Sequence, residues 1–210
     1  MSDSLLVTRP NFDLTTRYIS AWAGKVVKFA KSKNKNVFDL GKDRANREEF
    51  ESMIRKHSPD LVFLNGHGNE NQVAGQDNEV LLSLGDNENI LKNKAVYALS
   101  CRSGKLLGPG SIKSGASSYI GYEEDFIFLY DEKQINRPKE DKTAEIFLEP
   151  SNQVMISLLK GHAAKEAHEN SKQSFAKRIR KMLSSQSTRI ESSAVRYLIW
   201  DMQCQVCHEK

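Results

Sequence analysis

Short apolar runs alternate with longer amphipathic stretches along the first two thirds of the chain. Runs of four or five residues, rich in β-branched and aromatic side chains, occur at 5–8, 36–40, 61–64, 95–99 and 118–122. Such runs are typical of strands buried on both faces of a parallel sheet. Apolar residues at helical spacing fill two of the intervals, at about 13–31 and 44–56. The alternation predicts an α/β fold with a doubly wound, mostly parallel sheet flanked by helices.

The remaining segments predict smaller elements and a helical end. Residues 79–82 resemble one arm of a small hairpin, the turn-rich stretch 104–115 can hold a short helix, and 126–130 can form a further strand. The polar stretch 136–142 is expected to be an exposed loop, followed by helices at about 152–160, 163–184 and 191 to the end. We expect one domain over 1–210, with an α/β core over about 1–135 and a helical C-terminal part over about 143–210.

Two of the predicted strands end at a reactive residue. The run at 61–64 leads into Asn65-Gly66-His67-Gly68, and the run at 95–99 leads into Ser100-Cys101-Arg102-Ser103-Gly104. The carboxyl ends of parallel strands form the ligand crevice of open α/β sheets. If the two strands are neighbours, an imidazole and a thiol meet there, which predicts a cysteine nucleophile with a histidine base.

The residues around this pair suit acyl transfer. The N–H groups of Gly68 and Cys101 are candidates for an oxyanion hole, and the glycines beside His67 let a substrate backbone come close. The alternative is structural, because a buried cysteine often acts as a small hydrophobe and a histidine is often a turn residue.

Composition is that of an ordinary globular protein, with 39% hydrophobic and 28% charged residues. No apolar run has the length of a membrane span, and the N-terminus lacks a basic region followed by an apolar stretch. We therefore expect a cytoplasmic protein without membrane contact. Its three cysteines are an odd number, which fits reduced thiols better than a disulfide framework.

Positive charge gathers near the C-terminus. The net charge is +4, and residues 170–190 contain six basic side chains and no acidic one. A basic helix at 172–181 suits nucleic acid or an acidic partner, whereas the alternative is a solvated helix face. Phe175 is the single aromatic residue among these charges, too few for a base-stacking platform, which argues against nucleic acid.

The His-Gly and Cys motifs on successive strands resemble the caspase-like (clan CD) cysteine peptidases. The resemblance covers about residues 5–170 and is strongest to CHAT and gingipain-like domains, which share the small-residue turn and strand at 115–121 and the later helix at 155–167. It implies a cysteine endopeptidase acting on a protein or peptide, with Cys101 as nucleophile and His67 as base. It implies no cofactor and no metal.

The match departs from caspases at the nucleophile. The caspase pattern is Gln-Ala-Cys-Arg-Gly, and here only Cys101-Arg102 is shared, so aspartate specificity is not supported. The interval of 34 residues from His67 to Cys101 is shorter than the caspase interval of about 50 residues. The shorter interval favours the CHAT and gingipain-like side of the group.

Three acidic residues follow the strand at 118–122. Glu123, Glu124 and Asp125 lie next to the expected crevice, where a carboxylate can bind a basic P1 side chain of a substrate. Members of this peptidase group often cleave after Arg or Lys. Asp125 is the preferred candidate because it adjoins the apolar run Phe126-Ile127-Phe128. The alternative is a solvated acidic turn.

The chain ends in Cys204-Gln205-Val206-Cys207-His208, the pattern of c-type haem attachment. Haem attachment requires export, and a zinc site requires further ligands that the sequence does not supply nearby. The helix predicted from about residue 191 to the end of the chain is apolar on two opposite sides. This pattern predicts burial of the helix inside the fold, or contact with a regulatory partner or a second copy.

These observations favour a cysteine endopeptidase. Two alternatives stay open: a non-catalytic caspase-like module for protein interaction, and a nucleic-acid-binding protein that uses the helix at 172–181. In the first alternative, His67 and Cys101 would lie too far apart for proton transfer.

Overall fold

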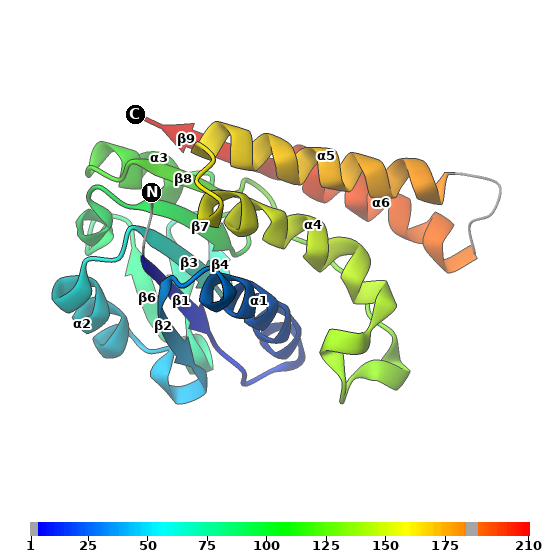
Figure 1. The fold of residues 1–210 in the computed structure, drawn as a ribbon, viewed down its shortest axis with the longest axis horizontal. Helices are drawn as coiled ribbons and strands as arrows, with labels where there is room; N and C mark the ends of the chain where they lie inside the picture. The colour runs from blue at the N-terminus through cyan, green and yellow to red at the C-terminus, as the bar shows by residue number, and fades with distance from the viewer. Residues whose placement is uncertain (1–3, 184–188) are drawn as a thin grey trace.

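A six-stranded sheet forms the centre of the computed structural model, which describes residues 4–183 and 189–210 (Figure 1). The strand order is β2-β1-β3-β7-β8-β9. The first five strands are parallel, and β9 runs antiparallel to β8. Their bounds are β1 Ser4–Arg9, β2 Asn36–Gly41, β3 Leu61–Asn65, β7 Ala95–Leu99, β8 Ser118–Tyr122 and β9 Gln205–Glu209.

Helices cover both faces of this sheet. One face packs on α1 (Leu14–Ser32), α4 (Lys142–Leu159) and the start of α5 (Ala164–Met182). The other face packs on α2 (Arg47–His57), α3 (Leu107–Lys113) and a small antiparallel sheet of β4 (Gly68–Asn69), β5 (Gln72–Ala74) and β6 (Val80–Ser83). The predicted α/β fold with a mostly parallel central sheet flanked by helices is therefore confirmed.

Two hydrophobic cores follow from the side-chain alternation of the strands. On β3, Leu61 and Phe63 face the α1 side, whereas Val62 and Leu64 face the α2 side. All five residues of β3 are buried. A strand buried on both faces cannot show an apolar–polar alternation, which is why the sequence carries continuous apolar runs here.

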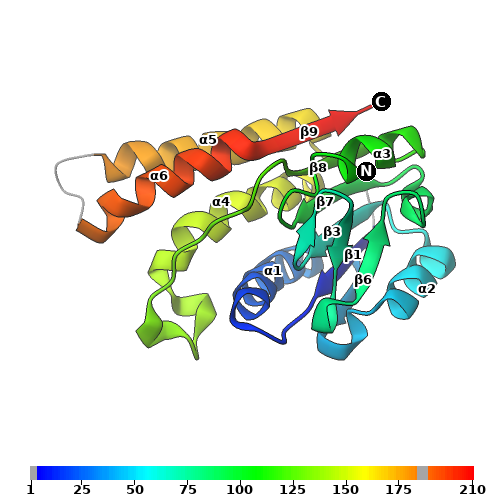
Figure 2. The same cartoon turned by 180° about the vertical axis from the view of Figure 1, so that it is seen from behind.

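The C-terminal helices form an antiparallel extension. Helix α6 (Arg189–Cys204) packs against α5, and both extend beyond the sheet (Figures 1 and 2). A third core joins α4, α5 and α6, with Phe147, Phe175 and Leu198 fully buried in it. Ser184, the predicted end of α5, lies outside the described residues.

Helix α4 begins ten residues earlier than the sequence predicts. Asp141 caps its N-terminus, accepting hydrogen bonds from the N–H groups of Thr143 (2.8 Å) and Ala144 (3.0 Å) and from the Tyr18 hydroxyl (2.8 Å). The expectation of an exposed loop through residue 142 is therefore wrong at Asp141, which is fully buried. Pro150 lies inside the helix. Proline usually ends a helix because it lacks an N–H and its ring clashes with the preceding turn, so the sequence places the start of this helix after Pro150.

The last residues form a strand where the sequence predicts a continued helix. Helix α6 ends at Cys204, and Gln205–Glu209 pairs with Ser118–Tyr122 of β8. The strand contributes Cys207 to the core on the α1 side and His208 to a hydrogen bond with the Gly104 carbonyl (2.8 Å). The carbonyl lies in the turn after Cys101, so the C-terminal strand helps to hold that turn.

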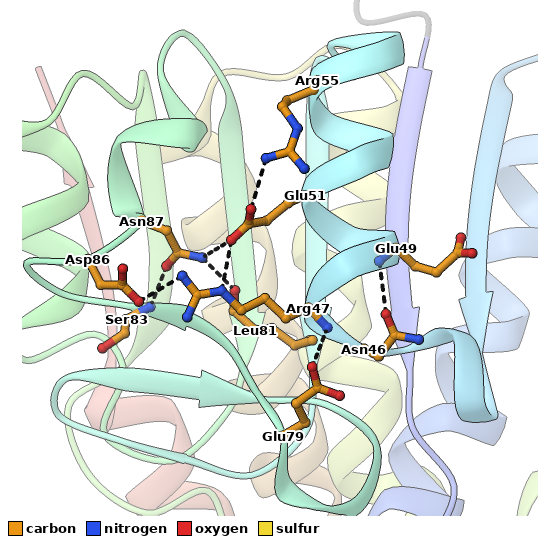
Figure 3. Close-up of polar contacts among 10 residues, drawn as sticks. All are labelled: Asn46, Arg47, Glu49, Glu51, Arg55, Glu79, Leu81, Ser83, Asp86 and Asn87. Carbon is orange, nitrogen blue, oxygen red and sulfur yellow. Dashed lines mark hydrogen bonds and ion pairs between the residues drawn. The ribbon is translucent and has the colours of Figure 1, made fainter.

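A polar network fixes α2 to the small sheet (Figure 3). Glu51 accepts hydrogen bonds from Arg47 (2.8 Å), Arg55 (2.9 Å) and Asn87 (3.0 Å). The Asn87 amide also donates to the Leu81 carbonyl of β6 (2.9 Å). The hydrogen bonds from Arg47 and Asn87 lower the pKa of Glu51 to about 2. Because the small sheet begins at Gly68, this network supports the segment that follows His67.

The network predicts a loss of stability in acid. A carboxyl with a lowered pKa stabilises the folded state above its ordinary pKa of about 4.5, and this contribution is lost as the pH falls toward 2. We expect Glu51→Gln to lower the free energy of unfolding at pH 7 by about 1–2 kcal/mol, a value reduced by solvent screening near the surface. Urea unfolding at pH 7 and pH 2.5 measures this, and the difference should shrink at the lower pH. Glu48→Gln, an exposed change on the same helix, is the control.

Candidate active site

Strands β3 and β7 are hydrogen-bonded neighbours and end at the same level. Their register pairs Leu61 with Ala95 and Asn65 with Leu99. His67 and Cys101 each follow two residues later, so they occupy equivalent positions at the carboxyl edge of the sheet. The predicted adjacency of the two strands is confirmed.

The loops that follow the two strands pack directly against each other. The Gly66 N–H donates to the Leu99 carbonyl (3.4 Å), and the Leu107 N–H donates to the Glu70 carbonyl (2.8 Å). Ser100 is the residue before Cys101, and a Cβ on Gly68 would lie 2.1 Å from its hydroxyl oxygen. Only glycine therefore fits at position 68 while the two loops stay in contact.

Gly66 is required for a second reason. Its φ of +153° is a conformation that other residues rarely adopt, and a Cβ there would lie 2.0 Å from the Ala74 carbonyl oxygen. Ala74 belongs to β5 and donates its N–H to the His67 carbonyl (2.8 Å). The glycines on both sides of His67 thus allow the chain to turn sharply from the main sheet into the small sheet.

A carboxylate binds the imidazole of His67. The ring Nε2 lies 2.6 Å from Oδ2 of Asp13, and the Phe12 ring contacts the imidazole edge-on with 5.9 Å between ring centroids. Asp13 also caps helix α1, where its other oxygen accepts the Thr16 N–H (2.7 Å). Burial raises the pKa of Asp13, but its hydrogen bonds with Thr16 and His67 outweigh this effect and hold the pKa below its ordinary value.

Asp13 is a site residue that the sequence reasoning missed. It follows β1, which lies beside β3 in the sheet, so three neighbouring strands deliver Asp13, His67 and Cys101 to one edge. In the sequence, Asp13 looks like an ordinary helix cap, since an aspartate before an amphipathic stretch is a common start of a helix. Only the strand order places Asp13 beside His67, and the local sequence pattern does not encode the strand order.

The Cys101 thiol is partly buried and faces a different partner. Burial raises the pKa of the thiol, although the nearby backbone N–H of Phe126 favours the thiolate and opposes the change. In the described part of the chain, no hydrogen bond joins Cys101 to His67. The fold brings the two residues to one edge of the sheet without closing the contact between them.

The segment 123–130 runs past Cys101 as an irregular chain, so the prediction of a strand at 126–130 is wrong. The Ile127 N–H donates to the Asp201 carboxyl (2.9 Å), and the Trp200 indole N–H donates to the Asp125 carbonyl (2.9 Å). Both partners lie on α6. Because side chains satisfy these backbone groups, the segment needs no neighbouring strand.

The predicted substrate-binding acids lie along this segment. Asp125 forms an ion pair with Arg102 (2.9 Å), the residue after Cys101, and its side chain is 58% exposed. The Glu124 carbonyl accepts the Arg102 N–H (3.2 Å), whereas the Glu123 N–H donates to the Cys204 carbonyl (2.9 Å). Asp125 and Glu124 therefore lie beside the turn of Cys101, and Glu123 lies beside the end of α6.

The other two cysteines are structural. Cys204 and Cys207 pack against the core on the α1 side, and burial raises the pKa of each thiol to about 11. His208 binds the Gly104 carbonyl instead of joining them. Among the residues that the structure describes, no group of three or more His, Cys, Asp or Glu side chains could hold a metal ion.

Comparison with protein-family models and with curated proteins finds no match to this chain. Of the helices in the described residues, none combines the length and apolar character that crossing a bilayer requires. The function of the chain is therefore inferred from the geometry of the site and from the resemblance of its motifs.

Proposed function

We propose that this chain is a cysteine endopeptidase of the caspase-like type, with Cys101 as nucleophile and His67 as base. One observation carries the proposal: neighbouring parallel strands bring the histidine and the cysteine to equivalent positions at the carboxyl edge, with the Asp13 carboxylate 2.6 Å from the imidazole. A cysteine, a histidine and a carboxylate that orients the histidine are the parts that covalent acyl transfer requires.

Each group has a defined part in the proposed reaction. Asp13 accepts the hydrogen bond from Nε2, so Nδ1 of His67 carries the lone pair that takes the Cys101 proton. The thiolate then attacks the scissile carbonyl carbon, and the N–H groups of Gly68 and Cys101 are the proposed donors to the oxyanion. His67 returns the proton to the leaving amine, and water hydrolyses the thioester. No cofactor takes part in these steps.

The described arrangement is a resting one in our proposal, because no hydrogen bond joins Cys101 to His67 among the described residues. Burial raises the pKa of the Cys101 thiol, which disfavours the reactive thiolate in this arrangement. Catalysis requires the sulfur to approach His67. Because α6 holds the 123–130 segment through Trp200 and Asp201, this helix controls the movement in our proposal.

Asp125 is the proposed partner for a basic P1 side chain, and Arg102 competes with that substrate for it. The Arg102–Asp125 pair is exposed enough for a substrate arginine to replace Arg102. We expect Asp125→Asn to lower kcat/KM on Arg-P1 peptides about tenfold, because a charge-assisted contact is lost. Arg102→Asn should raise it by severalfold, and asparagine tolerates the positive φ of 56° at this position.

A panel of fluorogenic peptides that differ only at P1 tests the proposed function and its specificity. Arg-P1 and Lys-P1 peptides should be cleaved, whereas Asp-P1 and neutral peptides should be cleaved poorly. Cleavage that is independent of P1, with both variants equal to the wild type, would refute the role of Asp125. No cleavage of any peptide would refute the peptidase.

The non-catalytic interaction module remains the second candidate, since the described residues contain no Cys101–His67 hydrogen bond. The two candidates differ in one respect that can be measured. A peptidase needs His67 for the reactivity of Cys101, whereas an interaction module does not.

A further inference from the structure

A polar groove of about 770 Å³ lies between α4 and α5, and its lining is separate from the candidate active site. Helix α4 contributes Gln153 and Ser157, and Lys160 follows directly after its end. Helix α5 contributes Glu166, Asn170, Gln173, Ser174, Lys177 and Arg180. The α5 positions recur at intervals of three and four residues, so they form one continuous stripe along the helix.

Three cations of this groove have no carboxylate partner among the residues that the structure describes. Lys160 lies 5.9 Å from the centroid of the Phe29 ring, Arg180 donates to the carbonyl of Ala176 (3.3 Å), and Lys177 has no ion-pair partner in the described chain. By contrast, Arg178, which does not line this groove, forms an ion pair with Glu149. The three cations that line the groove thus have no ion-pair partner among the described carboxylates that would compete with an anionic ligand.

The negative charge in the groove already has a partner within the protein. Among the described lining residues Glu166 is the only acid, and it lies 2.7 Å from Nδ1 of His162. The electrostatic field of the groove is therefore positive, and an anionic ligand fits it.

Amides occupy the middle of the groove, between its charged ends. Gln153 and Asn170 both donate to the Ser157 hydroxyl, at 3.1 and 3.4 Å. Each amide keeps its oxygen and a second N–H for another partner. Such groups can bind the N–H and carbonyl groups of a peptide backbone.

The length of the groove also suits a peptide. From Glu166 to Arg180 the stripe on α5 covers about 21 Å, at about 1.5 Å per helical residue. An extended peptide rises about 3.3 Å per residue, so about six residues cover the same distance. Lys160 then faces one end of such a segment, and Lys177 and Arg180 face the other.

We propose that the groove between α4 and α5 binds an extended acidic peptide segment of a partner protein. Carboxylates of the segment pair with Lys160, Lys177 and Arg180, and the amides hold its backbone. Nucleic acid fits less well, because the described lining contains no aromatic side chain on which bases could stack. The proposal does not depend on peptidase activity.

Binding of a fluorescein-labelled hexaglutamate peptide, followed by fluorescence anisotropy in 50 mM and 200 mM NaCl, tests this proposal. We expect saturable binding that weakens with salt. Lys177→Gln with Arg180→Gln should raise Kd at least about fivefold. The control combines Lys165→Gln with Lys172→Gln, which removes the same charge from α5 outside the groove and should change Kd less than twofold.

Three results would overturn the proposal. The first is no binding of the peptide by the wild-type protein in 50 mM NaCl. The second is an equal loss of affinity in the control and the groove variant, which would indicate a general charge effect. The third is tighter binding of a six-nucleotide oligothymidylate than of the peptide, which would favour nucleic acid instead. Circular dichroism of both variants establishes that they are folded.

Discussion

Replacement of Cys101 by alanine is expected to lower peptide hydrolysis at least about a thousandfold while leaving the fold intact. The proposed reaction passes through a thioester, and alanine has no atom that can form it. The side chain is partly exposed at the end of β7, and a methyl group in place of the thiol changes its volume little. Cleavage of the best peptide of the panel and thermal unfolding of the same sample measure both expectations.

Cys207→Ala is the matched control. The chemical change is the same, but this thiol packs against the core and lies on β9. We expect the control to lose some stability and to keep its activity. Peptide cleavage by Cys101→Ala at the wild-type rate would exclude Cys101 as the nucleophile.

Asp13→Asn is expected to lower kcat roughly a hundredfold with little change in KM or in stability. Asparagine caps a helix about as well as aspartate, so α1 keeps its cap. What the variant loses is the negative charge beside Nε2 of His67, which fixes the ring and stabilises the imidazolium during proton transfer. This variant therefore separates the two roles that the structure gives to Asp13.

A second variant makes the separation complete. Asp13→Ala removes both the cap and the charge, so it should lose about 1 kcal/mol of stability in addition to activity. If Asp13→Asn keeps full kcat, Asp13 is only a helix cap. If it unfolds at the same temperature as Asp13→Ala, the loss of activity has a structural cause.

The central strands, and the edge of the sheet that carries the site, could be predicted from sequence because burial on both faces leaves a local trace. The runs ending before His67 and Cys101 carry no charged residue, and this pattern is typical of inner parallel strands. The expectation that the two strands are neighbours followed from their succession in the chain, and the register of Asn65 with Leu99 agrees with it.

Other features depend on contacts between residues far apart in sequence, which no local pattern encodes. The segment after Asp125 is apolar and aromatic, typical of a strand, but Trp200 and Asp201 from α6 take its hydrogen bonds. The final residues continue the apolar periodicity of α6, yet they pair with β8 because its outer edge is open to them. In both cases tertiary partners override local preference.

In the proposed function, the partly buried position of Cys101 gives the chain a way to keep its reactivity low. The Phe126 backbone lies near the sulfur, and two hydrogen bonds from α6 hold the segment that contains Phe126. Movement of α6 would therefore change the surroundings of the proposed nucleophile directly. Because α5 packs against α6, a partner bound to α5 is well placed to cause that movement.

The most direct test of the Cys101–His67 pair is covalent labelling by a peptidyl acyloxymethyl ketone with arginine at P1, followed by intact mass and peptide mapping. The account predicts a single adduct on Cys101, with Cys204 and Cys207 unmodified, and a rate at least about tenfold lower in His67→Ala. Equal modification of all three cysteines, or a rate that His67→Ala leaves unchanged, would contradict it.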